Sequence, residues 1–149
     1  MREEIFVDTA YLVAIVDPTD GLHEAVTTVT RTLALGTRFV TTAAVLTELL
    51  GYFAASRPLR TAGLRAVDRV RQSRAFLVVD FSPREFEAAL GFYRNRPDKA
   101  YSLVDCHSMV VMRRRSITRV LTTDRHFLQE GFTCLLPTAA RGVRSTSTR

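Results

Sequence analysis

Long hydrophobic runs are absent from this sequence of 149 residues. Its apolar stretches, such as residues 109–112, fall far short of the roughly 20 apolar residues that a membrane-spanning helix needs. The apolar run that begins at Ile5 is interrupted by Asp8, so the N-terminus lacks the continuous apolar core of a signal peptide. We therefore predict a protein without a membrane span that works in the cytoplasm.

Cysteine is scarce, and glycine motifs that cradle phosphates are missing. The two cysteines, Cys106 and Cys134, are too few for a disulfide framework and are not spaced like zinc ligands. We expect both to be small core residues. No Walker or dinucleotide-binding glycine pattern occurs, so a nucleotide cofactor is not expected.

Lysine is almost absent, because Lys99 is the only lysine among 21 basic residues, and the formal net charge is +6. Arginine pairs bidentately with phosphate, so this composition is compatible with a nucleic-acid partner. A preference for arginine can equally reflect the base composition of the genome. Residues 57–74 hold six arginines and one acid, Asp68. From this basic segment we select three candidate contacts to nucleic acid, Arg65, Arg69 and Arg71.

Short apolar segments alternate with helical patterns along the chain. Strands are predicted at residues 5–7, 39–42, 75–79, 119–124 and 132–136, and helices after Asp8, at residues 23–35, around residues 46–53, from Pro58, and at residues 83–93 and 102–115. Parallel neighbours need crossover helices, so this order predicts an α/β fold, a three-layer α/β/α sandwich with a mainly parallel central sheet. Residues 1–137 are predicted to form a single domain, and residues 138–149 a basic, disordered tail.

Four acids fall where such a sheet binds its ligands. Asp8 and Asp124 end predicted strands, Asp105 lies in the first turn of a helix, and Glu48 lies one turn into the helix that follows the second strand. Each acid alone has an ordinary explanation as a helix cap, a turn former or a solvated helix residue. Together they converge on the carboxyl-terminal edge of the sheet, where carboxylates repel one another unless a cation or protons neutralise them.

A bound metal ion resolves that repulsion. Oxygen-only ligands suit magnesium or manganese, which also bind substrate phosphate. Such ions activate water and stabilise the leaving oxygen in the cleavage of a phosphodiester bond.

Four segments around these acids resemble the successive motifs of the PIN domain family. They are residues 5–12 (IFVDTAYL), 47–50 (TELL), 102–106 (SLVDC) and 121–127 (LTTDRHF), in the order and at the spacing of that family. The similarity extends from about residue 5 to residue 137. One such segment is a weak signal, and four in order are fairly specific.

The resemblance implies a cytoplasmic endoribonuclease that uses Mg²⁺ or Mn²⁺, with Asp8, Glu48, Asp105 and Asp124 as its catalytic and metal-binding acids. Thr122 matches the hydroxyl residue near the fourth acid, which would position water or a neighbouring carboxylate. The short chain looks like the VapC toxins of toxin–antitoxin pairs, which cleave RNA, usually form homodimers and are inhibited by a VapB-type antitoxin. We also expect a homodimer because Leu59, Val67 and Val70 form an apolar stripe, predicted to be exposed, beside the arginines of residues 57–74.

The histidines lack metal-ligand spacing. His107 falls on the apolar side of its predicted helix, so we expect a structural role for it. His126 is expected to be a packing or hydrogen-bonding residue rather than the general base, and Ser102 a helix cap.

Two rival functions remain. A phosphatase of the haloacid dehalogenase type also places an aspartate after its first strand, but it commonly carries a second acid two residues later, where this sequence has Ala10. The other rival is a non-catalytic RNA- or protein-binding module that keeps the same fold. Loss of one acid would favour that module, and none of the four is missing.

Overall fold

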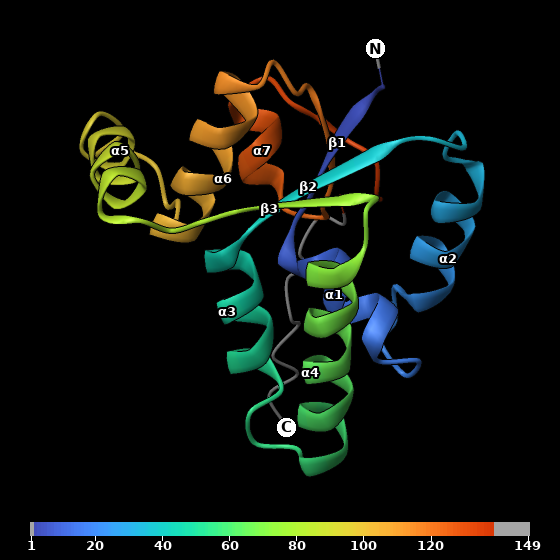
Figure 1. The fold of residues 1–149 in the computed structure, drawn as a ribbon. Coiled ribbons are helices and arrows are strands. Elements are labelled where there is room, and N and C mark those ends of the chain that lie inside the picture. The colour runs from blue at the N-terminus through green and yellow to red at the C-terminus, as the bar shows by residue number, and fades with distance from the viewer. Residues whose placement is uncertain (1, 139–149) are drawn as a thin grey trace, which may run out of the picture.

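The computed structural model describes residues 2–138, which form a parallel sheet flanked by helices (Figure 1). The elements are β1 (Glu4–Val7), α1 (Thr9–Val16), α2 (His23–Thr32), β2 (Arg38–Thr42), α3 (Ala43–Tyr52), α4 (Arg57–Gln72), β3 (Phe76–Val79), α5 (Pro83–Arg94), α6 (Leu103–Arg114), β4 (Arg119–Leu121), α7 (Arg125–Gln129) and β5 (Thr133–Cys134). The tail predicted for residues 138–149 lies outside the described residues, apart from Thr138. Within the described part of the chain, no helix is long and apolar enough to cross a membrane.

The sheet has the strand order β3-β2-β1-β4-β5, and all four pairings are parallel. The central strand is β1, where Phe6 lies beside Val40 of β2 on one side and Val120 of β4 on the other. Helices α1 to α4 lie below the sheet in the view of Figure 1, and α5 to α7 lie above it. The predicted α/β sandwich is therefore confirmed, and its sheet is entirely parallel within residues 2–138.

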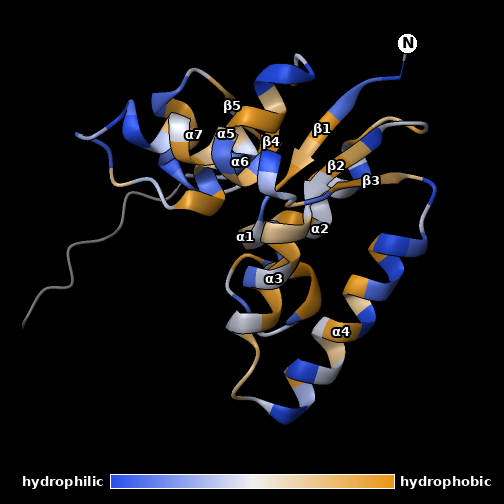
Figure 2. Cartoon of the chain, turned by 60° about the vertical axis from the view of Figure 1, so that its left-hand side comes forward, coloured by the Kyte–Doolittle hydropathy of each residue, from blue (hydrophilic) through white to orange (hydrophobic). Residues whose placement is uncertain are grey.

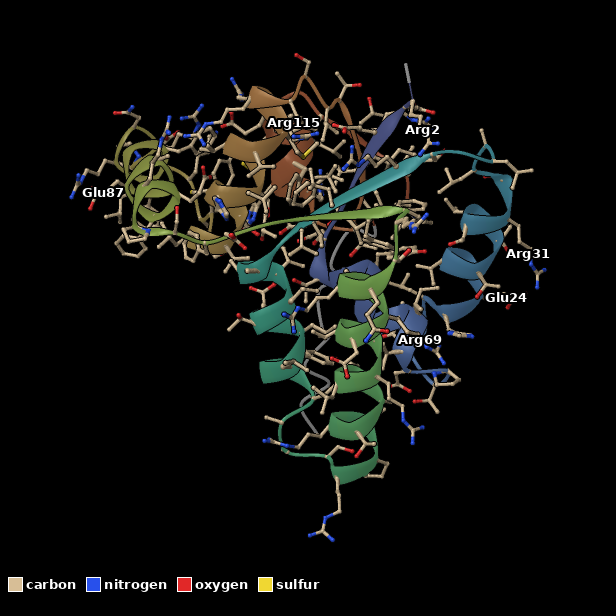
Figure 3. All side chains as sticks on the ribbon, viewed as in Figure 1. Arg2, Glu24, Arg31, Arg69, Glu87 and Arg115 are labelled. Carbon is tan, nitrogen blue, oxygen red and sulfur yellow. The ribbon has the colours of Figure 1, made fainter. Side chains whose placement is uncertain are left out.

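The core lies on both faces of β1, because its residues Ile5, Phe6 and Val7 are fully buried. Hydrophobic residues follow the strands and the inward sides of the helices, as the colouring of Figure 2 shows. Leu49 of α3 and Met109 of α6 are completely covered in this core. Charged side chains extend outward, as Arg69 on α4 does in Figure 3. Burial of this apolar surface is the main driving force for folding.

The apolar stripe of α4 faces this core, and the expectation that it is exposed is wrong. Val67 and Val70 are only 8% and 7% exposed, and Leu59 is half-buried against the same cluster. They pack inward because α4 crosses α1, α3 and β3. The exposed apolar side chain of α4 is instead Leu64. A dimer built on Leu59, Val67 and Val70 is therefore ruled out.

Strands at the two edges of the sheet differ from their predictions. The apolar run of β3 looked like a strand buried on both faces, yet all four of its residues are half-buried because β3 pairs only with β2. The last strand is shorter than the predicted residues 132–136, since β5 comprises only Thr133–Cys134. Phe132 and Leu136 nevertheless stay buried in the core.

Three consecutive arginines at the end of α6 join it to three other segments. Arg113 pairs with Glu130 (2.6 Å), Arg114 with Glu85 of α5 (2.5 Å), and Arg115 with Glu4 of β1 (2.7 Å; Arg115 is labelled in Figure 3). Positive charge at a helix C-terminus is also favourable for the helix dipole. The sequence assigned no role to this triplet, and the structure shows that it holds α6 in place.

Glu130 accepts the largest set of these contacts. Its carboxylate receives hydrogen bonds from Arg96 (2.6 and 3.1 Å), from the Tyr101 hydroxyl (3.1 Å) and from Arg113 (2.6 Å), while its side chain is 9% exposed. These bonds link the loop between α5 and α6, the end of α6 and the end of α7. The donors around Glu130 would have no acceptor if the carboxylate were removed.

Glu130→Ala is therefore expected to destabilise the fold by about 2 kcal/mol, because it leaves partly buried donors unpaired. Urea unfolding of the purified chain measures this free energy. Glu3→Ala is the matched control, since its partner Arg119 and Glu3 itself are both well exposed, and a change of less than about 1 kcal/mol is expected. Equal destabilisation in the two variants would contradict the role given to Glu130.

Candidate metal centre

Asp8 lies between the end of the central strand β1 and the start of α1, at the N-cap position of that helix. Its backbone N–H donates to Leu121 of β4 (3.2 Å), and its Oδ2 accepts a hydrogen bond from the Thr122 hydroxyl (2.7 Å). Burial raises the pKa of the Asp8 carboxyl to about 7; the hydrogen bond from Thr122 opposes this shift, and the negative charges of Asp105 and Glu48 add to it. A carboxylate in this position is destabilised unless a positive charge lies beside it.

Asp105 reaches the same place from α6. It forms a reciprocal capping box with Ser102, in which the Asp105 N–H donates to Ser102 Oγ (3.0 Å) and the Ser102 N–H donates to Asp105 Oδ2 (2.9 Å). The cap expected at Ser102 is confirmed. Burial raises the pKa of Asp105, the Ser102 N–H lowers it, and the negative charge of Asp124 raises it further. The capping box fixes the carboxylate at the helix start, facing the sheet edge.

Asp124 follows β4 and caps α7. Its Oδ1 accepts from the backbone N–H of His126 (2.9 Å), and its own N–H donates to Thr122 Oγ1 (3.0 Å). Thr122 thus donates to Asp8 and accepts from Asp124, so one fully buried hydroxyl joins two of the acids. This is the placement of a neighbouring carboxylate that the sequence suggested for Thr122.

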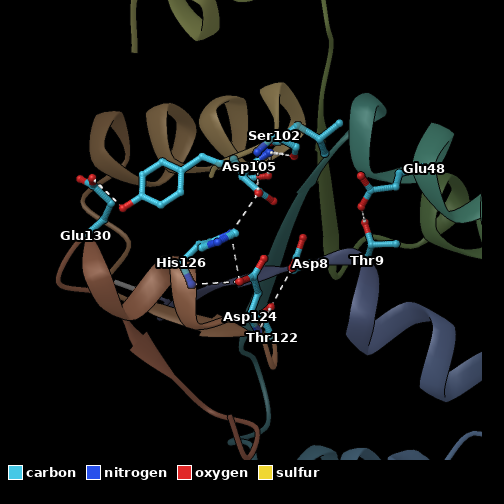
Figure 4. Close-up of polar contacts among 12 residues, drawn as sticks. Asp8, Thr9, Glu48, Ser102, Asp105, Thr122, Asp124, His126 and Glu130 are labelled. Atoms are coloured by element: carbon cyan, nitrogen blue, oxygen red, sulfur yellow. Dashed lines mark hydrogen bonds and ion pairs between the residues drawn. The ribbon is translucent and has the colours of Figure 1, made fainter. Parts of the chain in front are cut away.

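Glu48 lies apart from the other three acids. It is exposed on α3, and its Oε1 accepts a hydrogen bond from the Thr9 hydroxyl (2.5 Å). In Figure 4 it stands across Asp8 from Asp105 and Asp124. The structure therefore brings Asp8, Asp105 and Asp124 together, with Glu48 at the margin, where its charge still acts on Asp8.

His126 also lies at this acidic site, although sequence reasoning gave it only a packing or hydrogen-bonding role. Its Nδ1 is 3.2 Å from Asp124 Oδ1 and 3.5 Å from Asp105 Oδ2, and its ring packs on Tyr101 (centroids 5.2 Å apart; Figure 4). Asp105, Asp124 and His126 each offer one possible ligand atom within 4.8 Å of the others. The sequence signal that could have indicated this is that His126 follows Asp124 by two residues. Helix α7 starts between them, and its first turn brings the His126 ring back to the acidic site.

These residues fit a divalent cation. Two buried carboxyl groups with raised pKa values lie with a third acid and a buried imidazole nitrogen, and within residues 2–138 no lysine or arginine forms an ion pair with any of the three acids. Hard cations prefer carboxylate oxygens, and first-row ions also accept imidazole. Asp105, Asp124 and His126 are thus spaced to hold a metal ion, and the metal-binding roles predicted for Asp8 and Glu48 stay predictions.

The other candidates lie elsewhere. His107 is fully buried between α6 and α5, where its Nε2 lies 2.9 Å from Glu85, and this agrees with the expected structural role. Arg65, Arg69 and Arg71 are exposed on α4, a helix that contributes no residue to the acidic site. Cys106 is a buried thiol and Cys134 a half-buried one.

The pKa of Asp8 predicts how the stability of the metal-free protein changes with pH. In the unfolded chain the carboxyl loses its proton near its ordinary pKa of 3.8, but in the fold it holds the proton to about pH 7. Between these values the folded state binds more protons, so its stability falls as the pH rises and the loss is complete above the folded pKa. The shift corresponds to at most about 4 kcal/mol.

Asp8→Asn removes this loss, so in excess chelator it is expected to melt at a higher temperature than the wild type at about pH 8 and to differ little at about pH 4. Thermal unfolding across that range tests the effect. Asp80→Asn, at an exposed acid just after β3, is the control and should follow the wild type. If the melting temperatures of Asp8→Asn and the wild type changed with pH in the same way, the raised pKa of Asp8 would be contradicted.

Comparisons with known proteins agree with this architecture. The crystal structure of VapC20 from Mycobacterium tuberculosis, described as a sarcin–ricin loop cleaving toxin, aligns with a TM-score of 0.79 at 25% identity, over 89% of this chain and 99% of that one. FitAcB from Neisseria gonorrhoeae aligns with a TM-score of 0.60 at 18% identity, over 87% of this chain and 95% of that one.

A third similar structure is VapBC2 from Rickettsia felis bound to a DNA fragment from its promoter, with a TM-score of 0.56 at 13% identity, over 88% of this chain and 96% of that one. The last two likenesses, at low identity, show the fold alone. A comparison with curated protein sequences found no match.

The family profile described as "PIN domain" matches residues 5–131. This range contains all four motifs around Asp8, Glu48, Asp105 and Asp124. It spans every helix of the described chain, the strands β2, β3 and β4, and β1 apart from Glu4. The resemblance stated from the motifs is thus confirmed, and the chain belongs to the PIN domain family.

Proposed function

We propose that this protein is a metal-dependent endoribonuclease and the toxin of a VapBC-type pair. The observation that carries the proposal is the meeting of Asp8, Asp105 and Asp124, from β1, α6 and the end of β4, at one edge of the parallel sheet. Burial of Asp8 and Asp105 beside a third acid lowers the stability of the fold, so stability does not account for this arrangement. A site that binds a cation and a phosphodiester accounts for it, because it needs several carboxylates close together.

The bound ion, Mg²⁺ or Mn²⁺, would activate a water molecule and stabilise the leaving oxygen of the RNA phosphodiester. The residues of the chain supply position. Thr122 fixes the Asp8 carboxylate, and Ser102 fixes that of Asp105. For Glu48 the proposal keeps the catalytic and metal-binding role that the resemblance implies, and its support is that the charge of Glu48 acts on Asp8 from the margin of the site.

The substrate and partners follow from the relatives. VapC20 is described as a toxin that cleaves the sarcin–ricin loop, which supports an RNA substrate for this chain. We propose a VapB-like antitoxin as its inhibitor, a homodimer as its assembly and the cytoplasm as its place of action. The homodimer now rests on the family alone, because the α4 stripe that first suggested it is buried.

The rival functions have less support. A non-catalytic module would not need to retain all four acids, and Asp8, Asp105 and Asp124 meet at one sheet edge, with Glu48 beside them. A phosphatase of the haloacid dehalogenase type would use a second acid at position 10, where the chain has Ala10 on α1.

Asp8→Asn tests the catalytic role, because it keeps the shape of the side chain but removes its charge. RNA cleavage is expected to fall by at least about 100-fold. RNA binding should persist, since the change removes negative charge near the phosphates. The measurement is cleavage of a mixed RNA pool by the purified chain with Mg²⁺ or Mn²⁺ and with chelator, next to Asp80→Asn as an exposed-acid control. Full cleavage by Asp8→Asn, or by the wild type in chelator, would refute the proposal.

Substitution of the arginines of α4 is expected to affect RNA binding rather than cleavage. Neutralising Arg65, Arg69 and Arg71 to glutamine is expected to weaken RNA binding and to lower the slope of log affinity against log salt by about one unit for each arginine that binds a phosphate. Cleavage of saturating RNA should change little. Arg113→Gln is a matched control, because that arginine is engaged with Glu130. An unchanged salt slope in the triple variant would remove α4 from the RNA-binding surface.

A further inference from the structure

The His126 imidazole is placed at the acidic site by contacts on several sides. Asp124 accepts the hydrogen bond of its backbone N–H, which fixes the start of α7. The Tyr101 ring packs on the imidazole, and the Tyr101 hydroxyl donates to Glu130, which Arg96 also holds. The ring therefore has a built position and does not need to be drawn in by a ligand (Figure 4).

The Nδ1 atom of His126 has no hydrogen-bond partner, although it is buried. It lies within ion-pair distance of Asp124 Oδ1 (3.2 Å) and Asp105 Oδ2 (3.5 Å), and each of these oxygens already accepts a backbone N–H, from His126 and Ser102 respectively. A buried polar atom without a partner is rare in native proteins and calls for a ligand, an ion or water. Here the nitrogen and two carboxylate oxygens face the same point.

The separations suit an octahedral cation. Neighbouring ligands that each lie about 2.1 Å from an ion are about 3 Å apart. The distances of 3.2 and 3.5 Å from Nδ1 to the two oxygens are close to that edge length, and Asp105, Asp124 and His126 each offer one ligand atom within 4.8 Å of the others.

We propose that His126 Nδ1 is a ligand of the catalytic cation and that the site therefore prefers Mn²⁺ to Mg²⁺. This inference rests on the proposed function, because it deepens the metal site assigned there. An all-carboxylate site suits both ions, whereas an imidazole nitrogen is a softer ligand that a first-row transition ion accepts more readily than Mg²⁺. The neutral imidazole donates its Nδ1 lone pair, so its remaining proton lies on Nε2.

The test loads the purified full chain with Mn²⁺ and records pulsed electron paramagnetic resonance, which detects coupling between the ion and a directly bound nitrogen. A nitrogen coupling is expected in the wild type and in His23→Asn, a histidine variant outside the site, and its loss is expected in His126→Asn. Titration calorimetry should show at least about a 10-fold loss of Mn²⁺ affinity in His126→Asn and a smaller loss for Mg²⁺. Circular dichroism checks that the variant folds.

The outcomes separate this inference from the proposed function. Bound Mn²⁺ without nitrogen coupling in the wild type, together with metal-dependent cleavage that Asp8→Asn abolishes, would overturn the role of His126 and leave the nuclease intact. An equal loss of Mg²⁺ and Mn²⁺ affinity in His126→Asn would overturn the preference for Mn²⁺. A wild type that binds neither ion would overturn both proposals. Because the spectrum of the wild type is decisive alone, a poorly folded variant does not block the test.

Discussion

The hydrogen bond from Thr122 to Asp8 is the constraint on which the acidic site depends. It joins the ends of β1 and β4, next in sequence to the main-chain hydrogen bond from the Asp8 N–H to Leu121. The same hydroxyl accepts the Asp124 N–H, so it sets the distance between two acids that come from distant parts of the sequence. Parallel pairing of β1 with β4 brings the strand ends together, and Thr122 turns that coarse alignment into a defined arrangement of oxygens.

Function and stability oppose each other at this edge of the sheet. Burial of Asp8 and Asp105 disfavours their charged forms, which are the forms that bind a cation. At the other end of α6, Arg113, Arg114 and Arg115 pair with acids of three other segments. These contacts lie away from the site, where, among residues 2–138, the Asp105 carboxylate has an ion-pair contact with His126 and none with a lysine or an arginine.

Sequence reasoning predicted what depends on local pattern. The short apolar run of β1 ending in Asp8, the capping serine before Asp105 and the repeated strand-to-acid pattern at Asp124 follow from periodicity and capping rules. What it missed depends on long-range packing. The apolar stripe of α4 looked exposed because no local signal tells which side α1, α3 and β3 cover. The position of His126 depends on Tyr101 and on the turn of α7, neither of which is visible in residue spacing.

The pairing of the arginines shows where positive charge remains available for a polyanion. Arg96, Arg113, Arg114, Arg115 and Arg119, all on the side of the sheet that carries α5 to α7 or on β4, form ion pairs with acids of the chain. Within residues 2–138, no arginine of α4 forms such a pair. A paired guanidinium has much of its field cancelled by its partner, whereas an exposed, unpaired one attracts phosphate at long range. The five arginines of α4 are therefore part of the positive charge that the described chain leaves unpaired, on a helix that contributes no residue to the acidic site.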